Sequence, residues 1–148
     1  KPYFNILRTV VLTSRHEMDP DMMVEASLKL DVHGNVEHTA AGGFGPVHAL
    51  DRALRRALTR WYPELEQMHL IDYKVRVLSP TRTNIPDAAE ENGTGSNVRV
   101  LIESSDGVAS WTTVGVSYSI IEASLEVLAD AVTCKLYKTE QARWRAEC

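Results

Sequence analysis

The chemically reactive residue types in this chain do not stand at the spacings that catalysis or metal binding requires. No serine lies in a nucleophile elbow, and neither cysteine, Cys134 nor Cys148, stands in a recognisable catalytic setting. The five histidines are scattered without the spacing of metal ligands, at His16, His33, His38, His48 and His69. The sequence therefore predicts no catalytic residue and no metal site.

One stretch, residues 42–58, has the composition of an anion seat. Gly42, Gly43 and Gly45 permit a tight backbone turn, and Pro46 suits the first position of a helix, where no N–H is needed. The free N–H groups at such a helix start can hold an anion such as a carboxylate. The G-x-G-x-x-G nucleotide pattern is absent. A plain strand-to-helix connection stays open as an interpretation of this stretch alone.

Size and charge restrict the class of protein. The chain has 148 residues, 44% of them hydrophobic, which suits one globular domain or two small halves that share a core. A net charge of -4 and the lack of a basic run argue against nucleic acid as a partner. No apolar run is long enough to cross a membrane, so we expect no membrane partner. The two cysteines suggest a reducing compartment, and we expect a cytoplasmic protein. The chain begins with Lys1 rather than Met, so we expect a fragment of a longer protein.

The periodicity of apolar residues predicts three strands and a helix, followed by the same order again. Strict alternation from Val24 to Val32 indicates a strand with one wet face. A capping box is expected at Ser119 and Glu122, at the start of the second helix. The expected elements are strands at 3–14, 24–32, 36–41, 68–78, 98–102 and 111–116, with helices from 46 to about 61 and from about 120, and a long connection over 79–96.

The two halves match at a constant offset of 74 residues (98 − 24 = 131 − 57 = 74). The matched pairs are Val24 with Val98, Thr39 with Thr113, Ala49 with Ala123, Leu54 with Leu128 and Ala57 with Ala131. We therefore predict an α+β fold of two βββα units, at about 3–62 and 68–137, related by a pseudo-twofold, with helices covering the sheets. The polar tail 138–148 is expected to fray. Since one unit leaves a sheet face open, a closed dimer is the simplest arrangement.

The motifs as a set resemble the C-terminal regulatory domain of citramalate synthase and 2-isopropylmalate synthase. The resemblance covers about residues 3–137 and leans toward the citramalate branch. It is carried by Gly45-Pro46-Val47-x-Ala49-Leu50-Asp51, Tyr62-Pro63-x-Leu65, Leu70-x-Asp72-Tyr73-Lys74-Val75-Arg76, Arg99-Val100-Leu101-Ile102-Glu103-Ser104, Trp111-x-Thr113-Val114-Gly115-Val116-Ser117 and Ile120-Ile121-Glu122-Ala123-Ser124.

This resemblance implies a function that composition alone does not. Enzymes of this family condense acetyl-CoA with a 2-oxo acid in an upstream, metal-dependent TIM barrel, and their C-terminal domain forms a homodimer. That domain binds the end-product amino acid at the dimer interface as a feedback inhibitor, isoleucine in the citramalate branch and leucine in the isopropylmalate branch. For this stretch, the resemblance implies no catalysis and no cofactor of its own. The divalent metal and acetyl-CoA belong to the upstream catalytic domain.

Carried over by motif, ten residues are expected to contact the effector. They follow the Gly-Pro turn, the Asp-Tyr-Lys strand, the entry to the next strand and the Val-Gly-Val run, as Val47, His48, Leu70, Tyr73, Val77, Thr94, Val98, Val116, Tyr118 and Ile120. Their apolar members suit a branched aliphatic side chain, although plain core packing would use the same residue types.

Three departures from the family pattern bear on that expectation. Phe44 stands where Asp or Asn is usual, Cys134 stands where Tyr is common, and an insertion at 79–92 precedes Thr94. Phe44 brings into question the polar contacts that would hold an amino group. Three other interpretations stay open: the regulatory domain of a 2-isopropylmalate synthase that binds leucine, a dimerisation module that has lost its effector, and a small stand-alone enzyme.

Overall fold

The computed structural model describes residues 3–16, 19–78 and 97–147, and confirms the predicted mixed α+β fold. Two three-stranded antiparallel sheets are each followed by a helix. The elements are β1 (Asn5–His16), β2 (Asp19–Val32), β3 (Asn35–Gly43), α1 (Pro46–Leu58), the 3-10 helix η1 (Pro63–Gln67), β4 (His69–Val77), β5 (Val98–Ser105), β6 (Ser110–Ser117) and α3 (Ile120–Glu147). The predicted connection over 79–96 lies outside the described residues.

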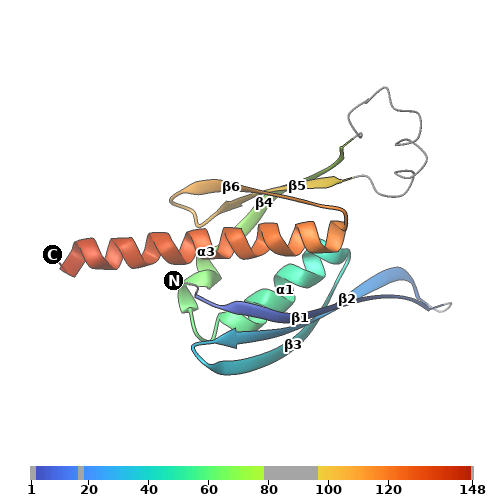
Figure 1. The fold of residues 1–148 in the computed structure, drawn as a ribbon, viewed down its shortest axis with the longest axis horizontal. Helices are drawn as coiled ribbons and strands as arrows, with labels where there is room; N and C mark the ends of the chain where they lie inside the picture. Colours follow the sequence, from blue (N-terminus) through green and yellow to red (C-terminus); the bar gives the residue numbers. More distant parts are fainter. Residues whose placement is uncertain (1–2, 17–18, 79–96, 148) are drawn as a thin grey trace.

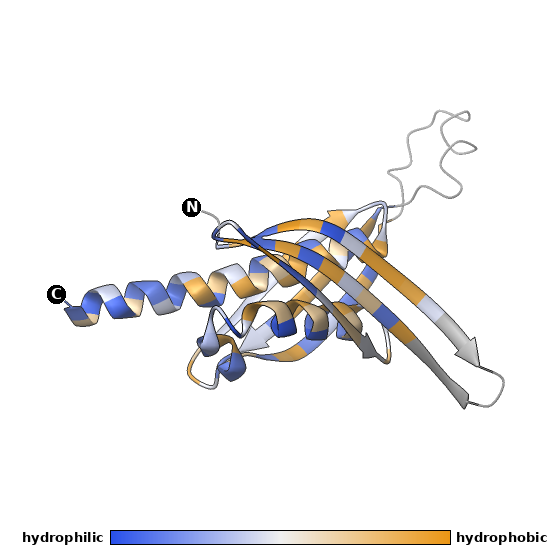
Figure 2. Cartoon of the chain, turned by 90° about the horizontal axis from the view of Figure 1, so that it is seen from below, coloured by the Kyte–Doolittle hydropathy of each residue, from blue (hydrophilic) through white to orange (hydrophobic). Residues whose placement is uncertain are grey.

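The two helices lie between the two sheets (Figure 1). Helix α1 packs on β2 and β3, helix α3 packs on β5 and β6, and the helices touch each other. Hydropathy follows this layering: apolar and polar residues alternate along the strands, while the last turns of α3 are mainly hydrophilic (Figure 2). The core therefore sits between each sheet and its own helix and continues through the contact of α1 with α3.

The strand pattern read from the sequence explains the first core. All five apolar positions of the alternation in β2 are buried, at Val24, Ala26, Leu28, Leu30 and Val32. They face α1, whose apolar stripe is equally buried at Leu50, Leu54 and Leu58. Fully burying one such side chain contributes roughly 1.5–3 kcal/mol relative to exposure, so these rows account for much of the cohesion of the sheet with its helix.

The two sheets share the same pairing register. Val24 pairs with Gly43 in the first sheet and Val98 pairs with Ser117 in the second, at the offset of 74 residues. Each edge strand also carries an irregularity at the same place, between Ile6 and Arg8 in β1 and between Leu70 and Asp72 in β4.

A side-chain hydrogen bond is repeated in the same way. The hydroxyl of Thr39 donates to the carbonyl oxygen of Ala53 at 2.9 Å, and the hydroxyl of Thr113 donates to that of Val127 at 3.0 Å. Each bond fastens the middle of a third strand to the backbone of the helix that covers it. The offset read from the sequence therefore extends to backbone pairing and to side-chain contacts.

Each helix covers only two of the three strands in its sheet. Both pack on the second and third strand of their unit, which leaves the helix side of the first strand largely open. On β4 this open side carries Tyr73, Val75 and Val77, which are 40%, 39% and 63% exposed. Each of them pairs with a residue of β5 on the same face, and the partners of Tyr73 and Val75 are fully buried. The second unit therefore presents an uncovered apolar strip along β4.

The end of the chain differs from its expected form. Residues 138–147 continue α3 without interruption to Glu147, whereas the sequence suggested a fraying polar tail. The helix extends past the sheets, and its end lies on the same side of the molecule as the beginning of β1 (Figure 1). The segment is polar, but most of its residues are strong helix formers (Lys, Glu, Gln, Ala and Arg), so the helix continues without an apolar stripe.

A buried ion pair ties the second unit together. The ammonium group of Lys135 in α3 lies 2.8 Å from the Asp106 carboxylate in the β5–β6 turn, and both side chains are about nine-tenths buried. Lys135 also donates to Gln67 of η1 at 3.4 Å. The hydrogen bond from Lys135, helped by the backbone N–H groups of Ala109 and Val108, holds the pKa of Asp106 well below its usual range, although burial opposes this shift.

We predict that Asp106→Asn lowers the free energy of unfolding near neutral pH by about 3 kcal/mol, because it leaves Lys135 buried without its counter-charge. Since the folded pKa of Asp106 is depressed, its stabilisation is present above the unfolded pKa, about 4, and is lost as the pH falls below that value. The variant should therefore show a weaker loss of stability below about pH 4, measured by urea denaturation across pH.

The matched control is Asp72→Asn. Asp72 pairs with Lys74 at 3.7 Å, but these side chains are 46% and 73% exposed. An exposed pair contributes about 0–1 kcal/mol, so this variant should unfold almost like the parent chain. Equal losses in the two variants would contradict a structural role for the Asp106–Lys135 pair.

Candidate functional site

Among the described residues, no side chain caps the start of α1. Gly45 caps the helix with an extended backbone, φ -156° and ψ 173°, and supplies no side-chain cap. Its carbonyl oxygen accepts the N–H of Ala49 at 3.0 Å. Pro46 follows, and no acidic residue lies in the first turn. The positive end of the helix dipole is therefore not neutralised by a carboxylate of the helix itself.

The start of α3 is already neutralised. Ser119 accepts the backbone N–H of Glu122 at 3.4 Å, which confirms the serine half of the predicted capping box. The other half differs, because the Glu122 carboxylate accepts the Ser117 hydroxyl at 3.1 Å and the N–H of Ser119 goes to that same hydroxyl. The start of α1 could thus accept an external anion, whereas at the start of α3 the side chains of Ser119 and Glu122 already take that role.

Phe44 holds His48 in place at the start of α1. The backbone N–H of Phe44 donates to Nδ1 of His48 at 3.1 Å, and the two rings stack with centroids 5.6 Å apart and planes 7° from parallel. Since Nδ1 accepts, the neutral imidazole carries its proton on Nε2 and offers it outward. The residue that departs from the family pattern therefore orients a hydrogen-bond donor by its backbone and its ring.

Gly43 allows the close approach on which this arrangement depends. A Cβ at this position would lie 2.6 Å from the backbone nitrogen of Ala49 and 2.8 Å from Nδ1 of His48. At Gly45 a Cβ would meet nothing within 4 Å. Of the two glycines, it is Gly43 that the packing of the turn against the helix requires.

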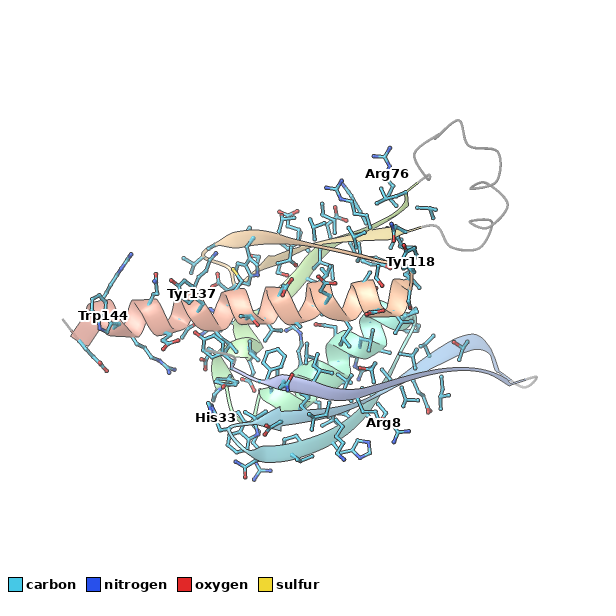
Figure 3. All side chains as sticks on the ribbon, viewed as in Figure 1. Arg8, His33, Arg76, Tyr118, Tyr137 and Trp144 are labelled. Atoms are coloured by element: carbon cyan, nitrogen blue, oxygen red, sulfur yellow. The ribbon has the colours of Figure 1, made fainter. Side chains whose placement is uncertain are left out.

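The structure brings most of the predicted effector residues to one end of the molecule. Val77, Val98 and Ser117 are neighbours across β4, β5 and β6, so Val116 and Tyr118 lie beside them. This is the end at which both helices begin, and Tyr118 lies next to the first turn of α3 (Figures 1 and 3). The residues gathered there are His48, Val77, Val98, Val116, Tyr118 and Ile120. Val116 pairs with Arg99, so its side chain lies on the face of the sheet opposite to Val77 and Val98.

The remaining predicted residues lie elsewhere. Tyr73 lies four residues before Val77 on the same face of β4, and Leu70 lies near the opposite end of that strand, paired with Ser104. At about 3.3 Å per residue, Leu70 is roughly 20 Å from Val77, so within one chain they do not contact the same small molecule. Thr94 lies outside the described residues. Val47 is 7% exposed and packs in the core rather than at the surface.

A narrower candidate lies where Tyr73 of β4 comes close to Ser124 of α3. Tyr73 and Val77 share the open face of β4, and Ile120 and Ser124 share one face of α3 at i and i+4. We call these four residues the β4–α3 seam. Burial raises the pKa of Tyr73, and the nearby Ser124 hydroxyl acts against this rise. Apolar side chains thus border a buried hydroxyl along the seam.

Ser124 was not predicted as a site residue. Its hydroxyl is fully buried and has no hydrogen bond of acceptable geometry among the described residues. A buried hydroxyl without a partner costs about 1–3 kcal/mol, which a ligand or a water molecule would recover. Its sequence signal was a serine at a position where the apolar stripe of the helix requires a hydrophobic residue.

The most pronounced cavities of the described chain do not include the predicted residues. One of them, of about 710 Å³, lies along the C-terminal half of α3 and is lined by residues that include Tyr3, Cys134, Tyr137 and Trp144. Figure 3 shows Tyr137 and Trp144 along that part of the helix. Among residues 3–16, 19–78 and 97–147, no group of three or more His, Cys, Asp or Glu side chains could hold a metal ion. No helix in that part of the chain is long and apolar enough to span a membrane.

Comparison with known proteins defines the class. A family model described as the LeuA allosteric (dimerisation) domain matches residues 4–136. Since the match covers nearly the whole chain, the chain is an allosteric regulatory domain. It belongs to the LeuA allosteric (dimerisation) domain family, which confirms the resemblance read from its motifs.

Individual relatives show which branch of the family this chain is more similar to. The chain is 43% identical over 141 residues to the (R)-citramalate synthase of Geobacter sulfurreducens, and 46% identical over 141 residues to that of Aquifex aeolicus. Each match covers 95% of this chain and 25% of the relative, so the chain spans a quarter of the length of these enzymes. The 2-isopropylmalate synthase of Aquifex aeolicus is 29% identical over 137 residues, covering 93% of this chain and 23% of that enzyme.

We predict that Gly43→Ala lowers the free energy of unfolding by about 1–3 kcal/mol, because its Cβ would push the turn away from the start of α1. Gly45→Ala is the matched control and should cost less than about 1 kcal/mol, since its backbone is extended and its surroundings are open. Chemical denaturation of both variants measures the difference, and a larger loss in Gly45→Ala would contradict this account of the turn.

Proposed function

We propose that this chain is the regulatory domain of a citramalate synthase and that it binds a branched-chain amino acid, isoleucine, as a feedback inhibitor. The observation that carries the proposal is the 43–46% identity to enzymes named (R)-citramalate synthase over 95% of the chain. The corresponding identity to a 2-isopropylmalate synthase is 29%, which favours isoleucine over leucine as the effector.

The domain, on this proposal, arose by internal duplication of a βββα unit. The common register of the two sheets, their matching edge-strand irregularities and the paired Thr39 and Thr113 hydrogen bonds support this origin. The register of the second and third strands and the threonine hydrogen bonds agree at an offset of 74 residues, and the edge-strand irregularities agree at 64 (70 − 6 = 72 − 8 = 64). Two unrelated units would have no reason to match in all three respects. A pseudo-twofold between the units follows from the same matches.

A second copy of the chain completes the site in a homodimer. The uncovered strip of Tyr73, Val75 and Val77 leaves apolar area in water that a partner would bury, at about 25 cal/mol per Å². The pronounced cavities of the single chain avoid the predicted effector residues. Both features agree with an effector held between two copies at the end where the helices begin.

The chemistry at that end suits an aliphatic amino acid. The β4–α3 seam offers apolar groups to a branched side chain and the Ser124 hydroxyl to a polar group. The vacant start of α1 and the Nε2–H of His48 offer donors to a carboxylate. One misplaced methyl group changes binding by only about 1–3 kcal/mol, so isoleucine and leucine differ in affinity rather than in the mode of binding.

Catalysis resides in the rest of the parent enzyme. The upstream barrel would condense acetyl-CoA with a 2-oxo acid, using a divalent metal, in the cytoplasm. Effector binding would shift the population of two states of the parent enzyme, and substrate would oppose effector by the same free energy. The alternative of a dimerisation module without an effector gains less support, because Phe44 orients His48 instead of blocking it.

We predict that isoleucine raises the melting temperature of the 148-residue chain more than leucine or valine does. At a concentration about 100-fold above Kd, binding adds about 2.7 kcal/mol, which corresponds to a shift of roughly 5–10 °C for a domain of this size. Differential scanning fluorimetry with each amino acid measures the shift. No shift with any branched-chain amino acid at millimolar concentration would contradict effector binding and leave the dimerisation module.

The location of the site is tested by Ile120→Ala and Ser124→Ala, which should each reduce the shift with isoleucine. The matched controls are Val36→Ala on β3 and Val108→Ala in the β5–β6 turn, which are 57% and 96% exposed and lie away from the seam. If the controls reduce the shift as much as the seam variants do, the site lies elsewhere.

A further inference from the structure

The outer face of the second sheet, opposite the helices, carries an arrangement of charge that the fold does not need. Arg76 of β4 and Arg99 of β5 are directly paired across the sheet. Lys74, two residues before Arg76 in β4, lies on the same face and pairs with Leu101. Like charges directly opposite each other destabilise a strand pair. The side chain of Arg76 points away from the helix layer (Figure 3).

No carboxylate neutralises the two arginines within the described part of the chain. None of the ion pairs found there includes Arg76 or Arg99. Lys74 has one such contact, at 3.7 Å from Asp72, and both side chains are exposed. Asp72 and Glu103 are the carboxylate residues of the same face, and they lie opposite each other in the strand register, next to the pair of Lys74 and Leu101. Charge on this face is thus separated into a basic end and an acidic end.

The first sheet shows that the fold does not require the basic pair. By the shared register, Leu12 and Glu25 occupy in β1 and β2 the places that Arg76 and Arg99 occupy in β4 and β5. The same backbone is therefore built with one apolar and one acidic residue. The arginine pair is a property of the second sheet and not of the βββα unit.

A cavity of about 460 Å³ lies between these cations. It is lined by Lys74, Val75, Arg76, Arg99 and Leu101. Its size falls within the range of about 300–1,000 Å³ that is usual for small-molecule sites. Three of the residues that line it carry a guanidinium or an ammonium group, and guanidinium groups bind phosphate or carboxylate oxygens in pairs of hydrogen bonds.

We propose that Lys74, Arg76 and Arg99 form a binding site for a small anion that carries two or more negative charges on phosphate or carboxylate groups. Such an anion neutralises the repulsion between the arginines and occupies the cavity between them. The site is separate from the β4–α3 seam, because Arg76 and Val77, like Arg99 and Val98, are adjacent residues whose side chains point to opposite faces of the sheet. Val116 pairs with Arg99, so this one predicted effector residue lies on the face of the arginines. The anion site goes beyond the proposed function and does not depend on it.

The test is a titration of the 148-residue chain by NMR with two probes, pyrophosphate for the phosphate class and succinate for the carboxylate class. Binding should shift the backbone amide signals of residues 74–76 and 99–101, and the tighter probe identifies the class of ligand. Acetate, which carries one charge, should bind at least about tenfold more weakly than the tighter probe. Absence of saturable shifts with both probes at millimolar concentration, or shifts centred on other residues, would overturn the proposal.

Arg76→Gln combined with Arg99→Gln should weaken the tighter probe by at least about tenfold. The matched control, Arg60→Gln with Arg145→Gln, removes the same charge from exposed positions on other elements and should change the affinity by less than about twofold. Equal weakening in both double variants would show a general charge effect and overturn the site. The titration contains no branched-chain amino acid, so its failure and the failure of isoleucine to raise the melting temperature are separate results.

Discussion

One geometric constraint underlies this structure: a single helix is narrower than a three-stranded sheet. Strands about 4.8 Å apart give a sheet roughly 14 Å wide, whereas a helix with its side chains is about 10 Å across. Each helix therefore covers the second and third strands of its unit and leaves the first. The exposed apolar strip on β4 follows from this mismatch in width. So does the need for another surface, which a second copy of the chain supplies in the dimer that we propose.

The sequence was sufficient for those parts of the fold that local periodicity determines. Alternation in β2 and the apolar stripe of α1 led directly to the first core, and the offset of 74 residues held for the strand register. The motif set led to the family that the comparisons then confirmed. Periodicity was less informative at the end of the chain, where α3 continues through a polar segment that has no apolar stripe to reveal it.

The candidate site was harder to predict because it depends on contacts between distant segments. Motifs placed Leu70 and Val77 in one list, but the strand that carries both residues separates them. Phe44 was interpreted as a departure that weakens the site, whereas its backbone and ring hold His48 in position. Among the described residues, the buried hydroxyl of Ser124 has no hydrogen-bond partner, and only the three-dimensional structure reveals this. Pairing, stacking and burial of this kind leave no signal in the spacing of residues.

The length of α3 has a mechanical consequence. Its 28 residues form one unbroken helix, about 42 Å long at 1.5 Å per residue. It begins beside the proposed effector residues, passes the beginning of β1 and ends beyond the sheets (Figure 1). A continuous hydrogen-bonded helix is stiff, so a tilt of its first turn about the contacts with β5 and β6 would be carried to its far end, where Glu140 contacts Tyr3 and Arg143 lies 3.8 Å from Glu64. The helix has the geometry of a lever, with its fulcrum on the second sheet and its long arm beyond the edge of that sheet.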